Sequence, residues 1–229
     1  MPVEVFYNIL SYISIISVLL PIIKFFIIKI RTDAIRLLFA LLCVSFAADI
    51  ANEIYLKLGY RGAEIVNIYF PLQFILVSFI FALLCEKMKD LIYTLSIAFT
   101  MFFIINCLFW QPFSMFQSNA AVLQDVIIIV YTFVYFYFVL KELEIGHLLR
   151  YSSFWIVTSL FLYSLLSVYI FALANYVFVF LPEKYAMLLW TFHDLSNILK
   201  NIMFFLAMVY TKRRTPPAIR IKRKTGVYQ

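Results

Sequence analysis

The stretch LIYTLSIAFTMFFIINCLFW, residues 91–110, decides the fold class because it holds no charged side chain in 20 consecutive positions. At about 1.5 Å per residue, a helix of this length spans the roughly 30 Å hydrocarbon core of a bilayer. The whole chain of 229 residues is similar: 65% are hydrophobic, 14% are charged, and the mean hydropathy is +0.97. Soluble domains have about 45–50% apolar and about 25% charged residues. The composition therefore predicts an all-α, polytopic membrane protein.

Seven apolar segments are long enough to cross a bilayer as helices, and charged or turn residues separate them. They cover residues 8–30, 34–56, 64–85, 91–110, 120–140, 152–176 and 185–210. Because the connections are short, we expect antiparallel neighbours and one seven-helix bundle over residues 1–211. This leaves no stretch for a soluble catalytic or nucleic-acid-binding domain. The first residues lack the basic start and the small-residue cleavage site of a signal peptide.

Lysine and arginine predict the orientation, because they accumulate in the cytoplasmic loops of membrane proteins. Alternation through seven spans places Lys57, Arg61 and Lys184 on one side of the membrane. The other side receives Lys24, Lys29, Arg31, Arg36, Lys87, Lys89, Lys141, Arg150, Lys212, Arg213, Arg214, Arg220, Lys222, Arg223 and Lys224. The N-terminus should therefore lie outside and the C-terminus in the cytoplasm. The net charge of +7 then reflects orientation and does not indicate nucleic-acid binding.

The tail, residues 212–229, is short and basic, and Pro216 and Pro217 divide it. We interpret it as a stop-transfer anchor followed by an unstructured end. The alternative interpretation is contact with anionic lipid or an acidic partner.

Polar residues inside the apolar segments mark the candidate site. A charge at the bilayer centre costs about 2.5–3.5 kcal/mol on insertion scales, so such residues are functional candidates. They are Asp49, Asn52, Glu53, Asn67, Gln73, Asn106, Gln124, Asp125, His193, Asp194, Asn197, Lys200 and Asn201. With antiparallel helices, most of them fall in the outer halves of their spans. The pattern predicts a polar funnel that opens outward and ends near Lys200.

Helical phase supports this interpretation, since Asp49, Asn52 and Glu53 share one face at 100° per residue. The last segment has a wide polar face that lipid cannot satisfy, so this face must point into the bundle. Four embedded acids face one certain cation, Lys200, whose best partner is an acid from another helix, Asp125 or Asp49. The alternative to a binding or proton-handling site is a structural network that holds the helices together.

Several chemistries are excluded by residue types and spacing. Two histidines, His147 and His193, cannot form HExxH or another multi-histidine zinc site. The glycines at 59, 62, 146 and 226 lie outside the segments, which excludes GxSxG and Gly-rich phosphate loops within them. The cysteines at 43, 85 and 107 have no metal-ligand spacing. We expect no metal and no enzyme; an intramembrane Asp–His hydrolase has no supporting feature beyond the adjacent residues 193 and 194.

The last segment resembles that of microbial rhodopsins, which are seven-helix, N-outside proteins of similar length with a retinal-binding lysine midway along the last helix. Lys200 matches that lysine, and the resemblance implies retinal as a cofactor. The family carries an aspartate four residues before the lysine, where this chain has Ser196. Its third-helix pattern of arginine and aspartate has no counterpart around Asn67 to Pro71, so we predict no cofactor and keep retinal on Lys200 as the alternative.

The motifs NIYFPLQF, residues 67–74, and HDLSNILKN, residues 193–201, are similar to those of small bacterial seven-helix membrane proteins without a known activity. This resemblance covers most of the chain loosely and implies a bacterial inner membrane.

The leading functional hypothesis is a sensor or receptor-like protein that binds a small polar or cationic ligand, or protons, in the funnel. Asp49, Glu53, Asp125 and Asp194 would supply negative charge, and His193 would make binding pH-dependent. Signalling would need a cytoplasmic partner. The alternatives are a permease or ion pathway and a non-catalytic subunit of a membrane complex. Because Pro21 and Pro71 do not interrupt corresponding segments, an inverted-repeat transporter is disfavoured.

Overall fold

The computed structural model describes residues 3–60, 62–142 and 148–212, and these ranges are helical apart from short connections. The helices are α1 (Val3–Ser17), α2 (Leu19–Ile27), α3 (Asp33–Lys57), α4 (Ala63–Leu84), α5 (Lys89–Phe109), α6 (Ser118–Glu142), α7 (Ser152–Phe180) and α8 (Glu183–Val209). The prediction of an all-α fold is confirmed for this part of the chain. The basic tail from residue 213 onward and His147 lie outside the described residues.

Each predicted segment falls on one helix, except that the first falls on α1 and α2 together. Pro21, in the first turn of α2, explains the break between these two helices. A proline has no N–H, so it cannot donate to the carbonyl of Ser17 four residues earlier. The regular bonding resumes only where the amide of Ile22 donates to the carbonyl oxygen of Val18, at 3.4 Å.

Six helical stretches of the described chain are long and apolar enough to cross a membrane, judged by length and composition. They are Glu4–Ile27, Asp33–Lys57, Ala63–Leu84, Glu86–Phe109, Ser118–Lys141 and Ser152–Phe180. The helix α8 is not among them; it has a comparable length of 27 residues but carries Asp194 and Lys200 in its interior. Large apolar side chains such as Ile97 and Tyr169 are exposed along the bundle, as contact with lipid tails requires.

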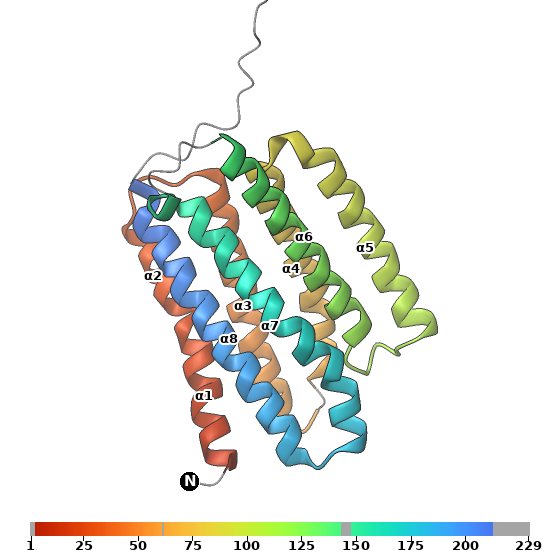
Figure 1. Ribbon diagram of the computed structural model, residues 1–229. Coiled ribbons are helices and arrows are strands. Elements are labelled where there is room, and N and C mark those ends of the chain that lie inside the picture. Colours follow the sequence, from red (N-terminus) through yellow and green to blue (C-terminus); the bar gives the residue numbers. More distant parts are fainter. Residues whose placement is uncertain (1–2, 61, 143–147, 213–229) are drawn as a thin grey trace, which may run out of the picture.

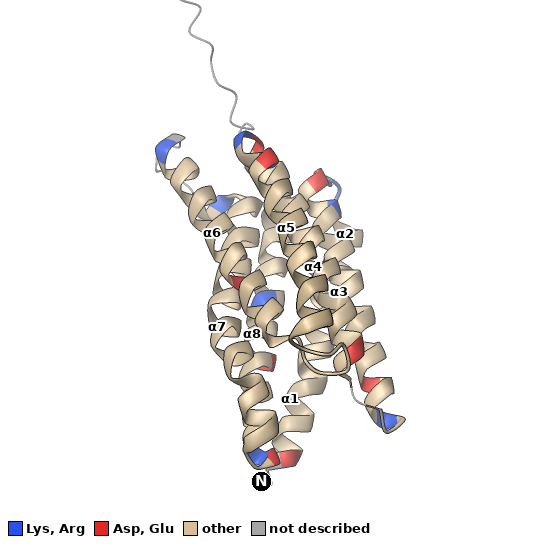
Figure 2. Cartoon of the chain, turned by 90° about the vertical axis from the view of Figure 1, so that its right-hand side faces the viewer, with Lys and Arg blue, Asp and Glu red and all other residues tan. Residues whose placement is uncertain are grey.

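The helices form a ring that positions the site (Figure 1). Going around it, α8 packs against α7, α1 and α2, while α7 packs against α6. The ring continues from α6 to α4, from α4 to α3 and from α3 to α2, and α5 packs on α4 and α6. The start of α1 and the connections α3–α4, α5–α6 and α7–α8 lie at one end of the bundle, here named the α1 end (Figure 1). Charged residues gather at both ends, and a few lie partway along the bundle (Figure 2).

Two hydrophobic clusters fill the bundle. Far from the α1 end, the larger cluster contains Leu38, Phe81, Leu160, Phe204 and Met208, which are almost completely buried. The smaller cluster lies toward the α1 end and is built around Phe70, Phe116, Ala121, Ile170, Phe171 and Ala174. A cavity with polar walls lies beside this smaller cluster.

Candidate functional site

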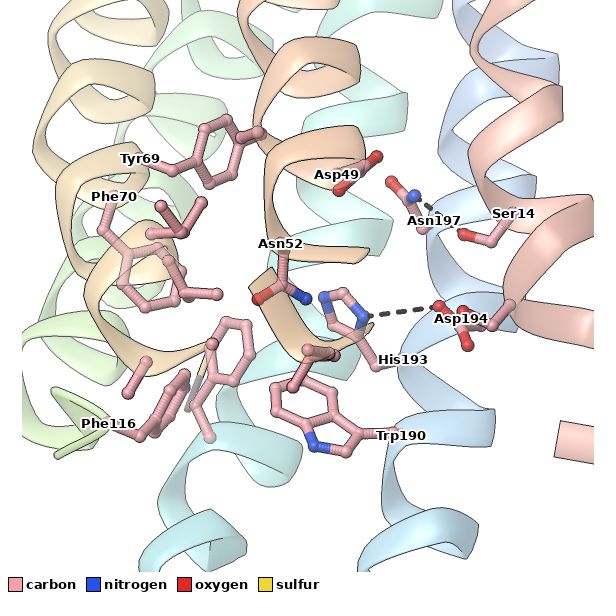
Figure 3. Close-up of a pocket in the computed structure, with 18 of the residues that line it drawn as sticks. Ser14, Asp49, Asn52, Tyr69, Phe70, Phe116, Trp190, His193, Asp194 and Asn197 are labelled. Atoms are coloured by element: carbon pink, nitrogen blue, oxygen red, sulfur yellow. Dashed lines mark hydrogen bonds and ion pairs between the residues drawn. The ribbon is translucent and has the colours of Figure 1, made fainter. Parts of the chain in front are cut away.

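A cavity of about 570 Å³ lies between α1, α3, α4, α7 and α8 and the connection between α5 and α6. It extends from Tyr7 and Leu56 near the α1 end to Lys200 in the middle of α8. Seven of the predicted site residues line it: Asp49, Asn52, Glu53, His193, Asp194, Asn197 and Lys200. Figure 3 shows five of them, with Asp49 and Asn52 on α3 facing His193, Asp194 and Asn197 on α8.

The acidic side of the cavity begins on α3. Glu53 lies toward the α1 end, where its Oε1 atom is 3.1 Å from Nζ of Lys57 and accepts a hydrogen bond of 3.2 Å from the hydroxyl of Tyr12 on α1. One turn deeper, the Oδ2 atom of Asp49 is buried and has no hydrogen-bond partner among the described residues. A buried carboxylate oxygen without a partner is costly, so Asp49 is the least satisfied acid of the cavity.

Asn52 lies between these two acids and shares their face of α3. Its Oδ1 atom is also buried without a hydrogen-bond partner among the described residues. The space it occupies depends on Gly62, since a Cβ atom built on that glycine would collide with Oδ1 of Asn52. The absence of a side chain at position 62 therefore leaves room for this amide inside the cavity.

On α8, His193 joins two neighbours. Its Nε2 atom lies 3.0 Å from the hydroxyl of Tyr163 on α7, and its Nδ1 atom lies 4.0 Å from Oδ1 of Asp194. The side chain of Asn197 donates a hydrogen bond of 2.9 Å to Oγ of Ser14 on α1. One turn of α8 therefore contacts α7 through His193, and the next contacts α1 through Asn197.

Lys200 forms the floor of the cavity and is 95% buried, with a relative exposure of 5%. Its Nζ atom lies 4.1 Å from the centroid of the Tyr163 ring. Asp49 and Asp125 are the acids that act on Lys200 electrostatically, although no described carboxylate oxygen lies within the 4.0 Å of an ion pair. The sequence analysis favoured Asp125 or Asp49 as the ion-pair partner of this lysine, and no such ion pair is found among the described residues.

Other predicted site residues do not line the cavity. Asp125, on α6, is 1% exposed and lies beyond the cavity wall. Gln124 donates to Gln73 at 3.3 Å, which links α6 to α4. Asn201 donates to Oγ of Ser17 on α1 at 2.8 Å. These contacts between helices match the structural alternative considered for the polar residues.

Asn67 has a structural contact of a different kind, because it holds the connection between α5 and α6. Its Nδ2 atom donates to the carbonyl oxygens of Phe113 and Met115, at 2.7 and 2.8 Å. Its Oδ1 atom accepts from the backbone amide of Gln117 at 3.2 Å. Asn106 supports the same connection by donating to the side chains of Gln111 and Gln117. Together they place Phe116 against the cavity.

An aromatic wall lines the side of the cavity opposite the acids, and the sequence analysis did not single it out. It consists of Phe70 on α4, Phe116 in the connection, Phe171 and Phe178 on α7, and Trp190 on α8. Their ring centroids lie 5.5–6.4 Å apart, which is typical of edge-to-face and tilted aromatic packing. Aromatics make up 20% of the chain, so no pattern distinguished these five.

The cavity has a surplus of negative charge. By formal charge, the lining residues Asp49, Glu53 and Asp194 count three negative against one positive for Lys200, with His193 counted as neutral. Lys57 compensates Glu53 in part from the α1 end. Within the described residues, no group of three or more His, Cys, Asp or Glu is arranged to hold a metal ion. No family model matches the chain, and no curated protein or solved structure matches it.

Proposed function

We propose that this protein is a seven-span sensor or receptor-like membrane protein that binds a small organic cation in the cavity. In this proposal α8 is the seventh span, the N-terminus and the α1 end face the outside, and the C-terminus is cytoplasmic. The alternation of lysine and arginine supports this orientation. The packing of α8 against α1, α2 and α7 supports its place as a span, since this packing keeps its polar face away from lipid.

The proposal that the ligand is positively charged rests on one observation. The cavity has more acids than cations, and one carboxylate oxygen of Asp49 inside it has no hydrogen-bond partner among the described residues. A cationic group of a ligand would satisfy this oxygen and reduce the repulsion among Asp49, Glu53 and Asp194. Ion pairs and charge-assisted hydrogen bonds of this kind are strong where water is scarce.

The closed floor of the cavity favours binding over conduction. Beyond Lys200, the bundle is filled by the larger hydrophobic cluster, with Leu38, Phe81, Leu160 and Phe204 each 0–1% exposed. A permease needs a polar route through this half, or a rearrangement that opens one. A ligand held above such a floor would act by shifting the equilibrium between bundle conformations, which a partner at the cytoplasmic loops or basic tail would detect.

The test is thermal unfolding of the purified protein in detergent, screened against organic amines, carboxylic acids, neutral metabolites and retinal. A ligand that binds only the folded state raises the melting temperature in a saturable way. We expect a rise with amines that is lost in Asp49→Asn and retained in Asp90→Asn. The control replaces an exposed carboxylate at the start of α5.

Other outcomes decide against the proposal. A response to amines that survives Asp49→Asn places the site elsewhere. Stabilisation by retinal alone, abolished by Lys200→Ala, would favour the rhodopsin-like alternative. If no compound stabilises the protein, the polar cluster is a structural network, and the role of a subunit in a membrane complex becomes the better hypothesis. Uptake of an amine by proteoliposomes would favour the permease.

A further inference from the structure

The size of the cavity restricts what can fill it. Its volume of about 570 Å³ exceeds that of a single water molecule, about 30 Å³, many times over. Sites for organic ligands have volumes of about 300–1,000 Å³. A proton or bare metal cation would leave nearly all of the space unfilled, so the geometry favours an organic molecule.

The two sides of the cavity differ in chemistry. Figure 3 shows Phe70, Phe116 and Tyr69 on one side and Asp49, Asn197 and Asp194 on the other. The aromatic side is supported by the smaller hydrophobic cluster, where Phe70, Phe116 and Phe171 are 2–7% exposed. The acidic side carries the surplus negative charge. A ligand that matches both sides needs one cationic end and one apolar end.

His193 shows how closely the two sides approach. Its ring centroid is 5.0 Å from that of Trp190 and 5.7 Å from that of Phe171, which belong to the aromatic wall. The same side chain has its Nδ1 atom 4.0 Å from the carboxylate of Asp194. One imidazole therefore spans the boundary, and a ligand needs only a short linker between its two ends.

We propose that the ligand is a primary or substituted ammonium ion joined by a short linker to an aromatic ring. The ammonium group is held by Asp49 and Asp194, and the ring packs against the wall formed by Phe116, Phe171 and Trp190. The ring gains edge-to-face contacts, and the cation gains attraction from nearby ring faces as well as from the carboxylates. This inference rests on the proposed binding of an organic cation and adds the apolar end of the ligand.

The test compares three probes by isothermal titration calorimetry of the protein in lipid nanodiscs. They are 2-phenylethylamine, ethylamine, which lacks the ring, and phenylacetate, which replaces the ammonium with a carboxylate. We expect 2-phenylethylamine to bind at least about tenfold more tightly than ethylamine, because the ring leaves water. Phenylacetate should not bind measurably.

Matched variants separate the two ends of the ligand. Trp190→Leu should reduce the affinity for 2-phenylethylamine toward that for ethylamine, and it should reduce the affinity for ethylamine much less, since only the attraction of the cation to this ring is lost. Trp110→Leu is the control, because Trp110 is 61% exposed near the end of α5 and does not line the cavity. Asp49→Asn should weaken the binding of both amines.

The outcomes distinguish this inference from the proposed function. Equal affinities for the two amines, or a ratio that Trp190→Leu leaves unchanged, overturn the aromatic end of the ligand and leave cation binding intact. Tight binding of phenylacetate overturns the charge assignment, and with it both proposals. If neither amine binds, both proposals are wrong.

Discussion

The ammonium group of Lys200 lies over the ring of Tyr163, with Nζ 4.1 Å from the ring centroid. The two residues are joined a second time through the backbone of α8, since Ser159, one turn before Tyr163 on α7, donates to the carbonyl oxygen of Lys200 at 2.9 Å. Tyr163 also bonds to His193 through its hydroxyl at 3.0 Å. The floor of the cavity is therefore a packed unit of α7 and α8, with acids on α3 and α6 acting on its buried cation.

Lys200 and Asp125 should be energetically coupled in folding. Lys200→Met leaves Asp125 without the cation that acts on it, and Asp125→Asn leaves Lys200 with Asp49 as its remaining acid, so each should lower the free energy of unfolding by about 1–3 kcal/mol. The double variant should lose less than the sum, by about 0.5–3 kcal/mol, because neither charge is then left alone. The free energies of unfolding of the wild type, the two single variants and the double variant can be measured by titration with sodium dodecyl sulfate. Additive losses would show that the two groups are independent, and Lys184→Met, at an exposed position, serves as the control.

Asn67 should keep the connection between α5 and α6 in a single, well-ordered conformation. Asn67→Ala leaves the carbonyl oxygen of Phe113 without this donor and leaves that of Met115 with only the 3.3 Å hydrogen bond from Gln117, and an unsatisfied buried group costs about 1–3 kcal/mol. We expect lower stability and faster amide hydrogen exchange over residues 111–118. Asn8→Ala is the control, since Asn8 is an exposed asparagine on α1 whose side chain makes no described hydrogen bond to this connection. Unchanged exchange in Asn67→Ala would mean that the connection is held by other contacts.

The helices could be predicted from the sequence because a lipid bilayer allows a membrane-spanning segment few conformations. Stretches such as residues 91–110 have few folded alternatives in a bilayer, because every backbone polar group needs an internal partner. The same constraint limits embedded charges, so Asp49, Glu53, Asp194 and Lys200 were expected to gather inside the bundle. The spacing of three and four residues among Asp49, Asn52 and Glu53 was sufficient to place them on one face.

The roles of individual side chains depend on how helices are rotated and crossed, and sequence spacing does not contain that information. Asn52 lines the cavity while Asn67 binds the backbone of a connection, although both are amides near the same end of the bundle. Asp125 lies outside the cavity because α6 contributes no residue to its lining. Phe116 and Trp190 could not be distinguished among so many aromatics without the contacts that bring them together.

Two hydrogen bonds between α1 and α8 should act as independent pairs. Ser14 accepts from Asn197 and Ser17 accepts from Asn201, at 2.9 and 2.8 Å. A double-mutant cycle of Ser17→Ala and Asn201→Ala should give a coupling energy of about 0.6 kcal/mol, the average for such bonds in membranes. The cycle of Ser17→Ala with Asn197→Ala combines residues that are not bonded to each other and should give a value near zero. Equal coupling in both cycles would indicate that α1 shifts as a whole and would contradict the assignment of separate pairs.

Lys57 competes with a cationic ligand for Glu53, so its removal should strengthen binding. Its Nζ atom lies 3.1 Å from Oε1 of Glu53 in a pair that is largely exposed on the lysine side. Exposed pairs of this kind contribute little to stability because solvent and salt screen them, so Lys57→Met should leave stability nearly unchanged. The affinity for 2-phenylethylamine should rise about two- to fivefold at low salt, since Glu53 would then act on the ligand alone. The gain should shrink at high ionic strength, because the exposed end of the cavity is screened.

The control for this effect is Lys184→Met, which removes another exposed lysine near the same end of the bundle, one with no described contact to Glu53. It should change the affinity for 2-phenylethylamine less than Lys57→Met does, because only the long-range field of the protein is altered. Glu53→Gln should weaken the binding of 2-phenylethylamine. If Lys57→Met and Lys184→Met raise the affinity equally, the gain comes from net charge, and Glu53 is not part of the binding surface.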